Sequence, residues 1–413
     1  MSAKQVEIVD IERIRLDLPL QQRNNTTWEI RAGGWSVFDL FKVTLGSGAI
    51  GVGETTVNYT WASGGDAMLE SLKGRNAIDL MWDDSLGAGL QMAIFDAAGK
   101  ALGVPIHRLL GRQHRDACPV SWWAQDMTPE AWALEAKTAE ENGFTSLKVK
   151  ARPWFDIDAQ LGAISAVVSR HFKIDTDFNE LLLGVDIAAP LLCRLEEKYP
   201  NLAIIESPIP QADVAGNVLL RSKIRSPIAM HIGNPPVMTA IRQGVCDGFV
   251  IGGGATTVMK EGTIAAAAGM PFWLQMVGTG LTTMFAVHLG AVLKQARWPA
   301  IPCINILEEN LLKSFVVEGG CVAVPQAPGL GVELNWEAIE RFRVAPDYQK
   351  PTPRQIHTIF WADGHQSHYP DGGYRGEFLE GKIIGFQPGI RLDYRLDDGS
   401  DEFDKEYGEL FPG

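Results

Sequence analysis

From Cys118 onward, short apolar runs recur about every 20 to 30 residues, and a stretch with helical character follows each of them. The runs are CPVSWW, TSLKVK, FKIDTD, LAIIES, SPIAMH, DGFVIG, MPFWLQ and IPCINI. A strand followed by a helix, repeated in this way, is the building unit of a parallel (β/α)8 barrel. Residues typical of helix ends support this pattern, because Thr128 and Pro129 stand where one helix is expected to begin and Gly143 stands where it is expected to end. The pattern therefore predicts an α/β fold with a TIM-like barrel over residues 119–324.

The chain on either side of this barrel has a different pattern. VEIVDIERIRLDL and WSVFDLFKVTLGSGAIGVGETT alternate like antiparallel strands, and SLGAGLQMAIFDAAGKALG has helical spacing. We therefore expect an α+β capping domain over residues 1–118. Residues 325–413 are expected to return to that domain, with an extra β-rich tail from about residue 347. In this tail QIHTIFWADG and GKIIGFQPGIRLDYRL look like strands, which return to the first domain, cover a barrel face or make a subunit contact.

The charge balance and the cysteines limit the classes of partner and compartment. The chain has 50 acidic and 37 basic residues, a net charge of −13, which argues against nucleic acid or an anionic membrane as partner. No apolar stretch reaches membrane-spanning length. The five cysteines show no paired spacing and indicate free thiols rather than a disulfide framework or a zinc site. We therefore expect a cytoplasmic protein that acts on a small molecule.

Polar side chains stand where the predicted strands end, which is where a parallel barrel carries its chemistry. TSLKVK places Lys148 and Lys150 on the same face of one strand. Asp175 and Asp177 end the next run, and Glu206 ends the one after it. Asp177 and Glu206 offer the oxygen ligands that Mg²⁺ prefers. Mutual repulsion and a nearby cation would lower the lysine pKa toward neutrality, so that one lysine could remove a proton beside a carboxylate.

Several short motifs extend this pattern over most of the chain. GVGETT (51–56), AIFDAAGKALGVPIHRLLG (93–111), LKVK, TDFN, IIESPIP and APGLGVELN occur in this order. Together they resemble the mandelate racemase and muconate lactonizing branch of the enolase superfamily. The resemblance implies that Lys150 is the base and that Lys148 lowers its pKa. It implies that Asp177 and Glu206 bind Mg²⁺ or Mn²⁺ and that Asn179 lies close to the metal or substrate.

The same resemblance implies the type of reaction and assembly. The expected substrate is a small carboxylic acid, such as an acid sugar, and the expected outcome is dehydration, racemisation or isomerisation. A homo-oligomer is expected, with neither nucleic acid nor membrane as partner. RNNTTW (23–28) resembles in position the mobile loop that covers the active site in this family, or it is a plain surface loop.

The chain departs from the family pattern at three strands. SPIAMH ends at His231, where the family usually carries an acidic metal ligand; DGFVIG lacks a second lysine; and MPFWLQ offers Gln275 in place of a histidine. Two carboxylates alone form a weak Mg²⁺ site. We expect His231 to point into the barrel mouth, where it holds a metal-bound water or serves as the missing acid/base. Asn234, before two prolines, is expected outside the site as a helix cap.

Three functions therefore remain open from the sequence. The first is metal-assisted removal of a proton α to a carboxylate. The second is a catalytically silent scaffold with a binding role, and the third is a barrel lyase or aldolase in which Lys150 forms a Schiff base. Dependence on a divalent metal separates the first from the others, and borohydride trapping separates the third from the second.

Overall fold

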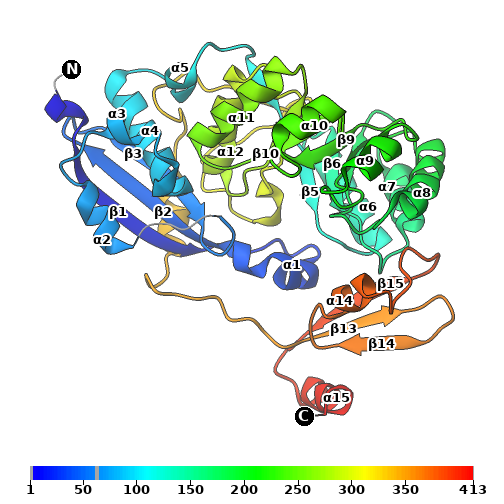
Figure 1. Ribbon diagram of the computed structural model, residues 1–413. Helices are drawn as coiled ribbons and strands as arrows, with labels where there is room; N and C mark the ends of the chain where they lie inside the picture. Colours follow the sequence, from blue (N-terminus) through cyan, green and yellow to red (C-terminus); the bar gives the residue numbers. More distant parts are fainter. Residues whose placement is uncertain (1–2, 61–64, 413) are drawn as a thin grey trace. The chain divides into compact units, whose positions relative to one another are not determined.

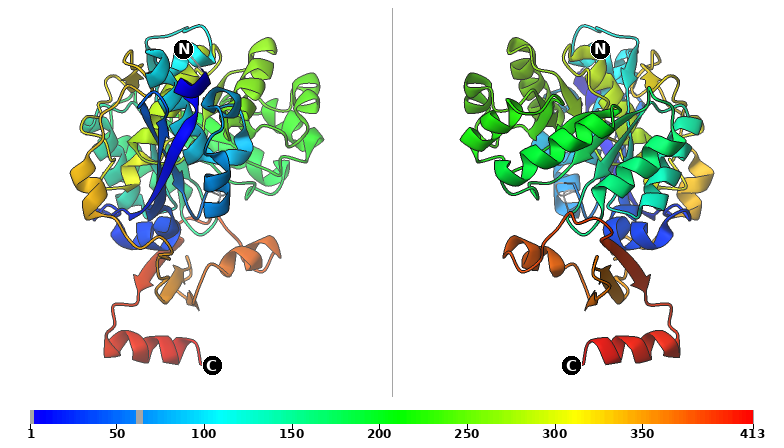
Figure 2. Two further views of the ribbon diagram at one scale, coloured as in Figure 1. Left: turned by 90° about the vertical axis from the view of Figure 1, so that its left-hand side faces the viewer. Right: turned by 90° about the vertical axis from the view of Figure 1, so that its right-hand side faces the viewer.

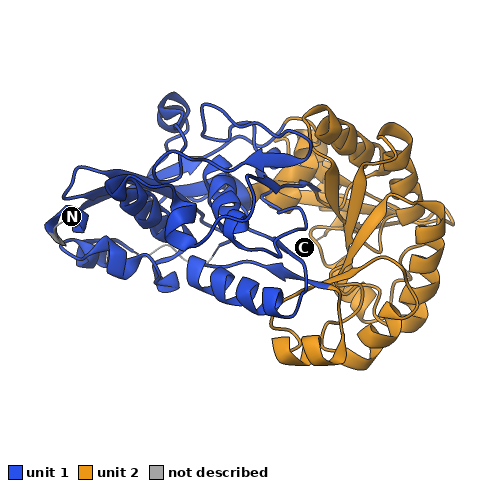
Figure 3. Cartoon of the chain, turned by 90° about the horizontal axis from the view of Figure 1, so that it is seen from above, with its two compact units in different colours: residues 1–21, 34–123, 248–350 blue, residues 22–33, 124–247, 351–413 orange. Residues whose placement is uncertain are grey.

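The structure is a computed structural model that describes residues 3–60 and 65–412. Two compact units make up the chain, and Figure 3 shows them in different colours. The first unit comprises Met1–Gln21, Gly34–Trp123 and Gly248–Lys350, and the second comprises Gln22–Gly33, Ala124–Asp247 and Pro351–Gly413. The barrel strands are divided between these units, so the predicted boundaries at residues 118 and 324 stay predictions.

The first unit contains a three-stranded antiparallel sheet in the order β1-β2-β3 (Figure 1). Its elements are β1 (Ile8–Asp17), β2 (Val37–Leu45), β3 (Ile50–Thr56) and the helix α4 (Ala88–Leu102) that packs against it. A Cβ atom on Gly51 would lie 2.0 Å from the Ala93 carbonyl oxygen, so glycine lets the helix approach the sheet closely. The strands and the helix that the sequence predicted here are confirmed, and the motif GVGETT lies in strand β3.

The remaining elements of the first unit include two strands of the predicted barrel, β10 (Gly248–Ile251) and β11 (Phe272–Leu274). The other helices and strands of this unit are α2 (Asp66–Leu72), α3 (Ala77–Leu80), α5 (Ile106–Leu110), β4 (Ala117–Pro119), α11 (Ala255–Ala267), α12 (Gly280–Val292), β12 (Cys321–Ala323) and α13 (Trp336–Arg341). β10 and β11 pair in parallel, whereas β4 and β12 pair antiparallel. The eighth predicted strand is wrong, because 301–306 contain only an isolated bridge at Ile301 and a 3₁₀ turn at Ile304–Ile306.

The second unit contains four consecutive parallel strands with their helices (Figure 1). They are β6 (Ser146–Lys150), β7 (Lys173–Asp177), β8 (Leu202–Glu206) and β9 (Ile228–His231), with α6 (Pro129–Glu141), α7 (Ile157–Val167), α8 (Val185–Lys198), α9 (Val214–Arg221) and α10 (Val237–Gln243). β5 (Trp122–Ala124) stands at the boundary between the units along the chain. The Thr128 side chain accepts a hydrogen bond from the Ala131 amide, which confirms the predicted start of α6.

Residues 351–413, called the extension below, also belong to the second unit. They form an antiparallel sheet in the order β14-β13-β15, from β13 (Gln355–Phe360), β14 (Gln366–Tyr369) and β15 (Arg391–Leu396). Two helices, α14 (Tyr374–Leu379) and α15 (Asp401–Leu410), complete it, and Figure 2 shows α15 in red at the end of the chain. The strands expected in QIHTIFWADG and GKIIGFQPGIRLDYRL are therefore present as β13 and β15.

Two further expectations from the sequence can be compared with the structure. None of the five cysteines, all of which lie in the described residues, forms a disulfide; Cys118, Cys246 and Cys303 are buried, and the other two are partly exposed. In residues 3–60 and 65–412, no helix is long and apolar enough to cross a membrane.

Candidate active site

The ends of β6, β7 and β8 bring four predicted site residues together. The parallel register aligns Lys150 with Asp177 and Asp177 with Glu206, so their side chains leave the sheet at one level. Lys148 Nζ lies 2.5 Å from Glu206 Oε2 and 3.5 Å from Asp177 Oδ2. Lys150 Nζ lies 2.5 Å from the same Asp177 oxygen. The Lys148 side chain is 1% exposed and the Lys150 side chain is 15% exposed, so Lys150 is the more exposed of the two lysines.

The surroundings move the pKa values of Lys150 and Asp177 in the directions that a base requires. Burial lowers the pKa of Lys150, and the Lys148 ammonium lowers it further, although the Asp177 carboxylate opposes them. Burial alone would raise the pKa of Asp177, but the ammonium groups of Lys150 and Lys148 outweigh it and hold the pKa below its ordinary range. Asp177 therefore stays ionised while Lys150 loses its proton more easily than an ordinary lysine.

Asp175 is a third carboxyl group in the same cluster. It precedes Asp177 by two positions on β7, so both side chains leave the same face of the sheet. Its side chain is buried, and this burial raises its pKa to about 7, against the nearby Lys148 ammonium. The neighbouring Glu206 carboxylate raises the pKa as well. Asp175 is therefore the carboxyl group of the cluster that most readily carries a proton near neutral pH.

Arg152 is a site residue that the sequence analysis missed. Its Nη1 donates to the Asp177 carbonyl oxygen at 3.1 Å, and its Nη2 donates to Asn179 Oδ1 at 2.5 Å. The same Asn179 oxygen lies 3.4 Å from Lys150 Nζ, and the Asn179 amide donates to Asp177 Oδ1 at 2.8 Å. Asn179 Oδ1 therefore lies within reach of both Lys150 and Arg152, and its expected place near the metal or substrate stays a prediction. The sequence KVKAR could have indicated Arg152, because side chains alternate along an extended chain and residues 148, 150 and 152 would then lie on the same side.

His231 reaches the same cluster from the end of β9. Its Nε2 lies 3.1 Å from Glu206 Oε1, and its side chain is 49% exposed. The ring nitrogen thus faces Glu206, and the expected role of His231 in the barrel mouth stays a prediction. Asn234 is not the expected helix cap, because α10 begins after Pro236 and has no side-chain cap. The Asn234 carbonyl instead accepts a hydrogen bond from Gln211 Nε2 at 2.9 Å, so the two prolines set the helix start without a polar cap.

The cluster fits a divalent cation poorly. Mg²⁺ requires near-octahedral oxygen coordination, and the two predicted ligands Asp177 and Glu206 are each already in contact with a lysine ammonium. A third acid is absent at the end of β9, where His231 stands. Within the described part of the chain, no three His, Cys, Asp or Glu residues are grouped in a way that could hold a metal ion. The Mg²⁺ site therefore stays a prediction, and the cationic groups nearest the carboxylates are those of Lys148 and Lys150.

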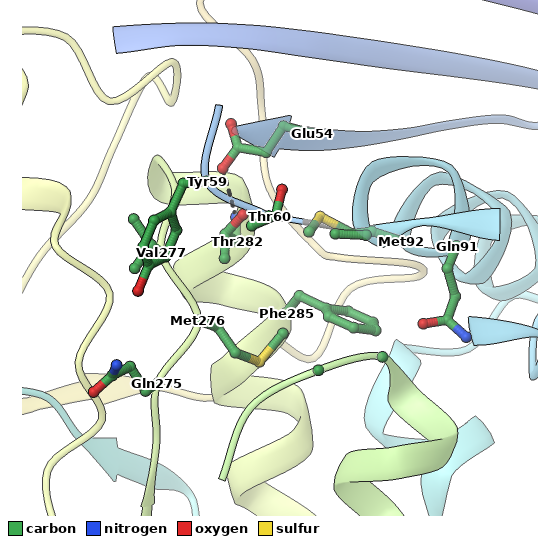
Figure 4. Close-up of a pocket in the computed structure, with 13 residues that line it drawn as sticks. Glu54, Tyr59, Thr60, Gln91, Met92, Gln275, Met276, Val277, Thr282 and Phe285 are labelled. Carbon is green, nitrogen blue, oxygen red and sulfur yellow. Dashed lines mark hydrogen bonds between the residues drawn. The ribbon is translucent and has the colours of Figure 1, made fainter. Parts of the chain in front are cut away.

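A separate pocket of about 340 Å³ lies within the first unit (Figure 4). Its lining is largely apolar and includes Tyr59, Met276 and Phe285, with Gln275 from the end of β11. Glu54 lies at one side, where it accepts hydrogen bonds from the Thr279 and Thr282 amides at the start of α12. Burial raises the pKa of Glu54 above its ordinary value, against these hydrogen bonds. Because both Glu54 oxygens already accept hydrogen bonds at a helix start, this carboxylate holds α12 rather than offering a free ligand.

Comparison with known proteins places these features in context. A model of the family described as Enolase C-terminal domain-like matches residues 131–338. Muconate cycloisomerase 1-1 of Acinetobacter lwoffii is 26% identical over 374 residues, which cover 82% of this chain and 96% of that protein. D-galactonate dehydratase of Ralstonia nicotianae is 27% identical over 300 residues, which cover 65% of this chain and 76% of that protein.

Solved structures give the same result at the level of the fold. The crystal structure of muconate lactonizing enzyme from Pseudomonas fluorescens complexed with muconolactone has a TM-score of 0.67 at 24% identity. The match covers 82% of this chain and 100% of that chain. This likeness confirms the predicted fold class, a TIM-like barrel with an N-terminal α+β capping domain, and the strands β13, β14 and β15 make up the predicted β-rich C-terminal extension.

Proposed function

The chain belongs to the Enolase C-terminal domain-like family, in the mandelate racemase and muconate lactonizing branch of the enolase superfamily, and we propose that it removes the proton α to the carboxylate of a small carboxylic acid. The relatives include cycloisomerases, a racemase, an epimerase and a dehydratase, so the outcome after proton removal is dehydration, racemisation or isomerisation. The observation that carries the proposal is the desolvated Lys150 amine, which lies between Asp177 and Asn179 at the strand ends.

In this scheme Lys150 is the general base. Its side chain is the more exposed of the two lysine side chains, and its lowered pKa increases the fraction of neutral amine at a given pH. Asp177 keeps its charge and holds the Lys150 nitrogen in place through the 2.5 Å contact. When Lys150 has accepted the substrate proton, the resulting ammonium is stabilised by the same carboxylate.

The negative charge that develops on the substrate carboxylate requires cationic partners. Lys148 and Arg152 are the two remaining cations of the cluster, and they are fixed by Glu206 and Asn179 respectively. Fixed charges in a site with little water stabilise an enediolate more strongly than the same charges in solution. His231, half-exposed beside Glu206, is our candidate for the group that returns or removes a second proton.

The proposal is tested by hydrogen–deuterium exchange at the substrate α-carbon. The wild-type protein is incubated in deuterated buffer with a panel of small hydroxy acids, sugar acids and N-acyl amino acids, with and without Mg²⁺, and loss of the α-proton signal is followed by NMR. Lys150→Met should abolish exchange, whereas Lys173→Met, at the exposed start of β7, should leave it unchanged. Exchange that survives in Lys150→Met would exclude Lys150 as the base, and trapping of a carbonyl compound by borohydride would indicate a Schiff base instead.

Compartment and assembly complete the proposal. The free cysteines and the acidic net charge are consistent with the reducing cytoplasm, and the expected state is a homo-oligomer without nucleic acid or membrane partners. Fractionation of cells and size-exclusion chromatography with light scattering test these two points.

A further inference from the structure

The extension packs against the segment that follows the proposed base. This segment, residues 151–156, connects β6 to α7 and is called the β6–α7 loop below. A buried apolar cluster joins the loop and the end of β7 to the extension, and its members are Trp154, Phe155, Leu181, Ile359, Tyr374, Phe378, Ile390 and Leu392. The family model ends at residue 338, so the extension lies outside the part of the chain that this model matches. The chain therefore carries an additional structural element that packs against the loop following its proposed catalytic lysine.

Hydrogen bonds join the same two segments along their backbones. The Phe386 amide donates to the Pro153 carbonyl oxygen at 2.7 Å, and the Asp156 amide donates to the Ile390 carbonyl oxygen at 2.9 Å. The Gly389 amide donates to Asp156 Oδ2 at 2.9 Å. The Phe386 ring also lies 6.0 Å, between centroids, from the ring of Phe178, which follows Asp177. The extension thus contacts the loop from Pro153 to Asp156 and the residue that follows β7 as well.

A buried carboxylate ties the loop to two further segments of the second unit. Asp126, which follows β5 and is fully buried, accepts a hydrogen bond from Trp154 Nε1 at 2.9 Å. It also accepts one from Arg31 Nε of α1 (Asn25–Ala32) at 3.0 Å and one from the Tyr394 hydroxyl of β15 at 3.4 Å. Burying this carboxylate is tolerated because several donors satisfy it at once. Most of the segment 23–28, expected as a loop over the active site or a plain surface loop, instead lies within α1, and Arg31 of this helix is hydrogen-bonded to Asp126.

Arg152 connects the β6–α7 loop to the surroundings of Lys150, the proposed base. It is the residue of the β6–α7 loop next to Pro153, and its guanidinium is nearly buried. Its two terminal nitrogens donate to the Asp177 carbonyl oxygen and to Asn179 Oδ1, and this Asn179 oxygen lies 3.4 Å from Lys150 Nζ. A shift of the loop would move the Arg152 guanidinium and release Asn179 from the Lys150 amine. The position of the amine therefore depends on contacts that originate in the extension.

We propose that the extension is a clamp that positions Lys150 for proton transfer, through the β6–α7 loop and Arg152. Trp154, Asp126 and Phe386 are then positioning residues, since none of them contacts the Lys150 amine. The inference rests on the proposed role of Lys150 as the base, because only then does its placement matter for the reaction. The proposed restraint itself can be measured without any substrate, because it consists of contacts within the protein from residues more than 200 positions away in sequence.

The test measures how fast the Lys150 amine reacts with trinitrobenzenesulfonate, quantified by mass spectrometry of its peptide. The full-length protein carries either Phe386→Ala, which removes the ring against Phe178, or Trp154→Phe, which removes the hydrogen bond to Asp126 and keeps an aromatic ring. Either change should raise the labelling rate of Lys150 about fivefold or more, because the loop opens more often. Arg354→Gln is the matched control, since it breaks the Arg354 ion pairs with Asp397 and Asp404 inside the extension. It should leave the rate unchanged.

Lys148 serves as the internal reference, because its side chain is only 1% exposed. A rise at Lys150 with Lys148 still unreactive supports the clamp. A Lys150 rate unchanged in both variants would overturn it, and so would a parallel rise at both lysines, which would report general loosening. Because labelling needs no substrate, the result stands apart from the exchange experiment. If Lys150→Met leaves exchange intact, the proposed function fails while the labelling still decides whether the extension restrains the amine.

Discussion

Replacing Lys148 by methionine removes the cation that lies between two buried carboxylates. Lys148 Nζ contacts Glu206 at 2.5 Å and lies 3.5 Å from Asp177, and none of the three side chains is more than 1% exposed. Methionine has a similar length and no charge, so the substitution leaves little empty space. Removing one partner from a buried ion pair costs about 3–5 kcal/mol, because the remaining charge has neither water nor counter-charge. We therefore expect Lys148→Met to lower the free energy of unfolding by this amount.

Urea unfolding followed by circular dichroism measures this loss. Adding Glu206→Gln to Lys148→Met should restore part of the stability, with a coupling free energy of about 0.5–3 kcal/mol, since the stranded carboxylate is neutralised. Lys198→Met is the matched control, because Lys198 pairs with Asp158 at 2.6 Å but its side chain is 57% exposed. Exposed pairs contribute little, so this control should lose far less stability. A loss below about 1 kcal/mol for Lys148→Met, or equal losses for both variants, would refute the reasoning that Lys148 is a buried counter-charge.

Four further outcomes are expected. Lys150→Arg should slow α-proton exchange nearly as much as Lys150→Ala, by about 10²- to 10⁴-fold, because arginine does not become neutral; retained exchange in deuterated buffer would contradict a base at this position. Calorimetric titration should show weaker Mg²⁺ binding than a site with three acids gives, and Glu206→Gln should weaken it further; an unaffected titration would place the ion elsewhere. His231→Ala should reduce activity or metal affinity, and full retention of both would make His231 structural. Burial lowers the pKa of His357 from 6.5 to about 4, with Arg31 adding to the shift, so the folded state resists protonation. The stability from His357 is present above pH 6.5 and is lost toward pH 4, by about 3 kcal/mol, and His357→Gln should flatten this dependence in acid unfolding followed by fluorescence.

The periodic part of the fold could be predicted from the sequence because each strand carries its own apolar run. The run IPCINI fails for a local reason that the apolar pattern does not contain. Cys303 has φ of 56°, in the left-handed region, so the chain leaves the extended conformation after Ile301 and turns into a 3₁₀ segment. A pattern of apolar residues indicates burial, and here the buried side chains belong to a turn instead of a strand.

Some of the site could likewise be predicted from the local sequence, whereas other contacts depend on residues far apart in the chain. The grouping of Lys150, Asp177 and Glu206 could be predicted, because each ends a strand in a fold that gathers strand ends, and Lys148 lies on the same face of β6 two positions earlier. The contacts of Asp126 could not, since its partners come from a helix about 95 residues earlier and a strand about 270 residues later. Nothing in the local sequence indicates which of these segments meet. The role of the extension therefore became visible only with the three-dimensional arrangement.

The balance of charge in the cluster explains how so many ionisable groups can be buried together. Three cations, from the Lys-x-Lys-x-Arg pattern on β6 and its loop, face three carboxyl groups on β7 and β8. The balance also holds when Lys150 is neutral and Asp175 carries a proton, and burial moves both pKa values in that direction. With Lys150 neutral and Asp175 protonated, no charge among these groups lacks a counter-charge. The proposed proton abstraction requires a neutral Lys150, and burial therefore does not destabilise the cluster in that protonation state. A divalent cation in the same place would add charge to a cluster that is already neutral, so its binding requires one of the two ammonium groups to move away from Asp177 or Glu206.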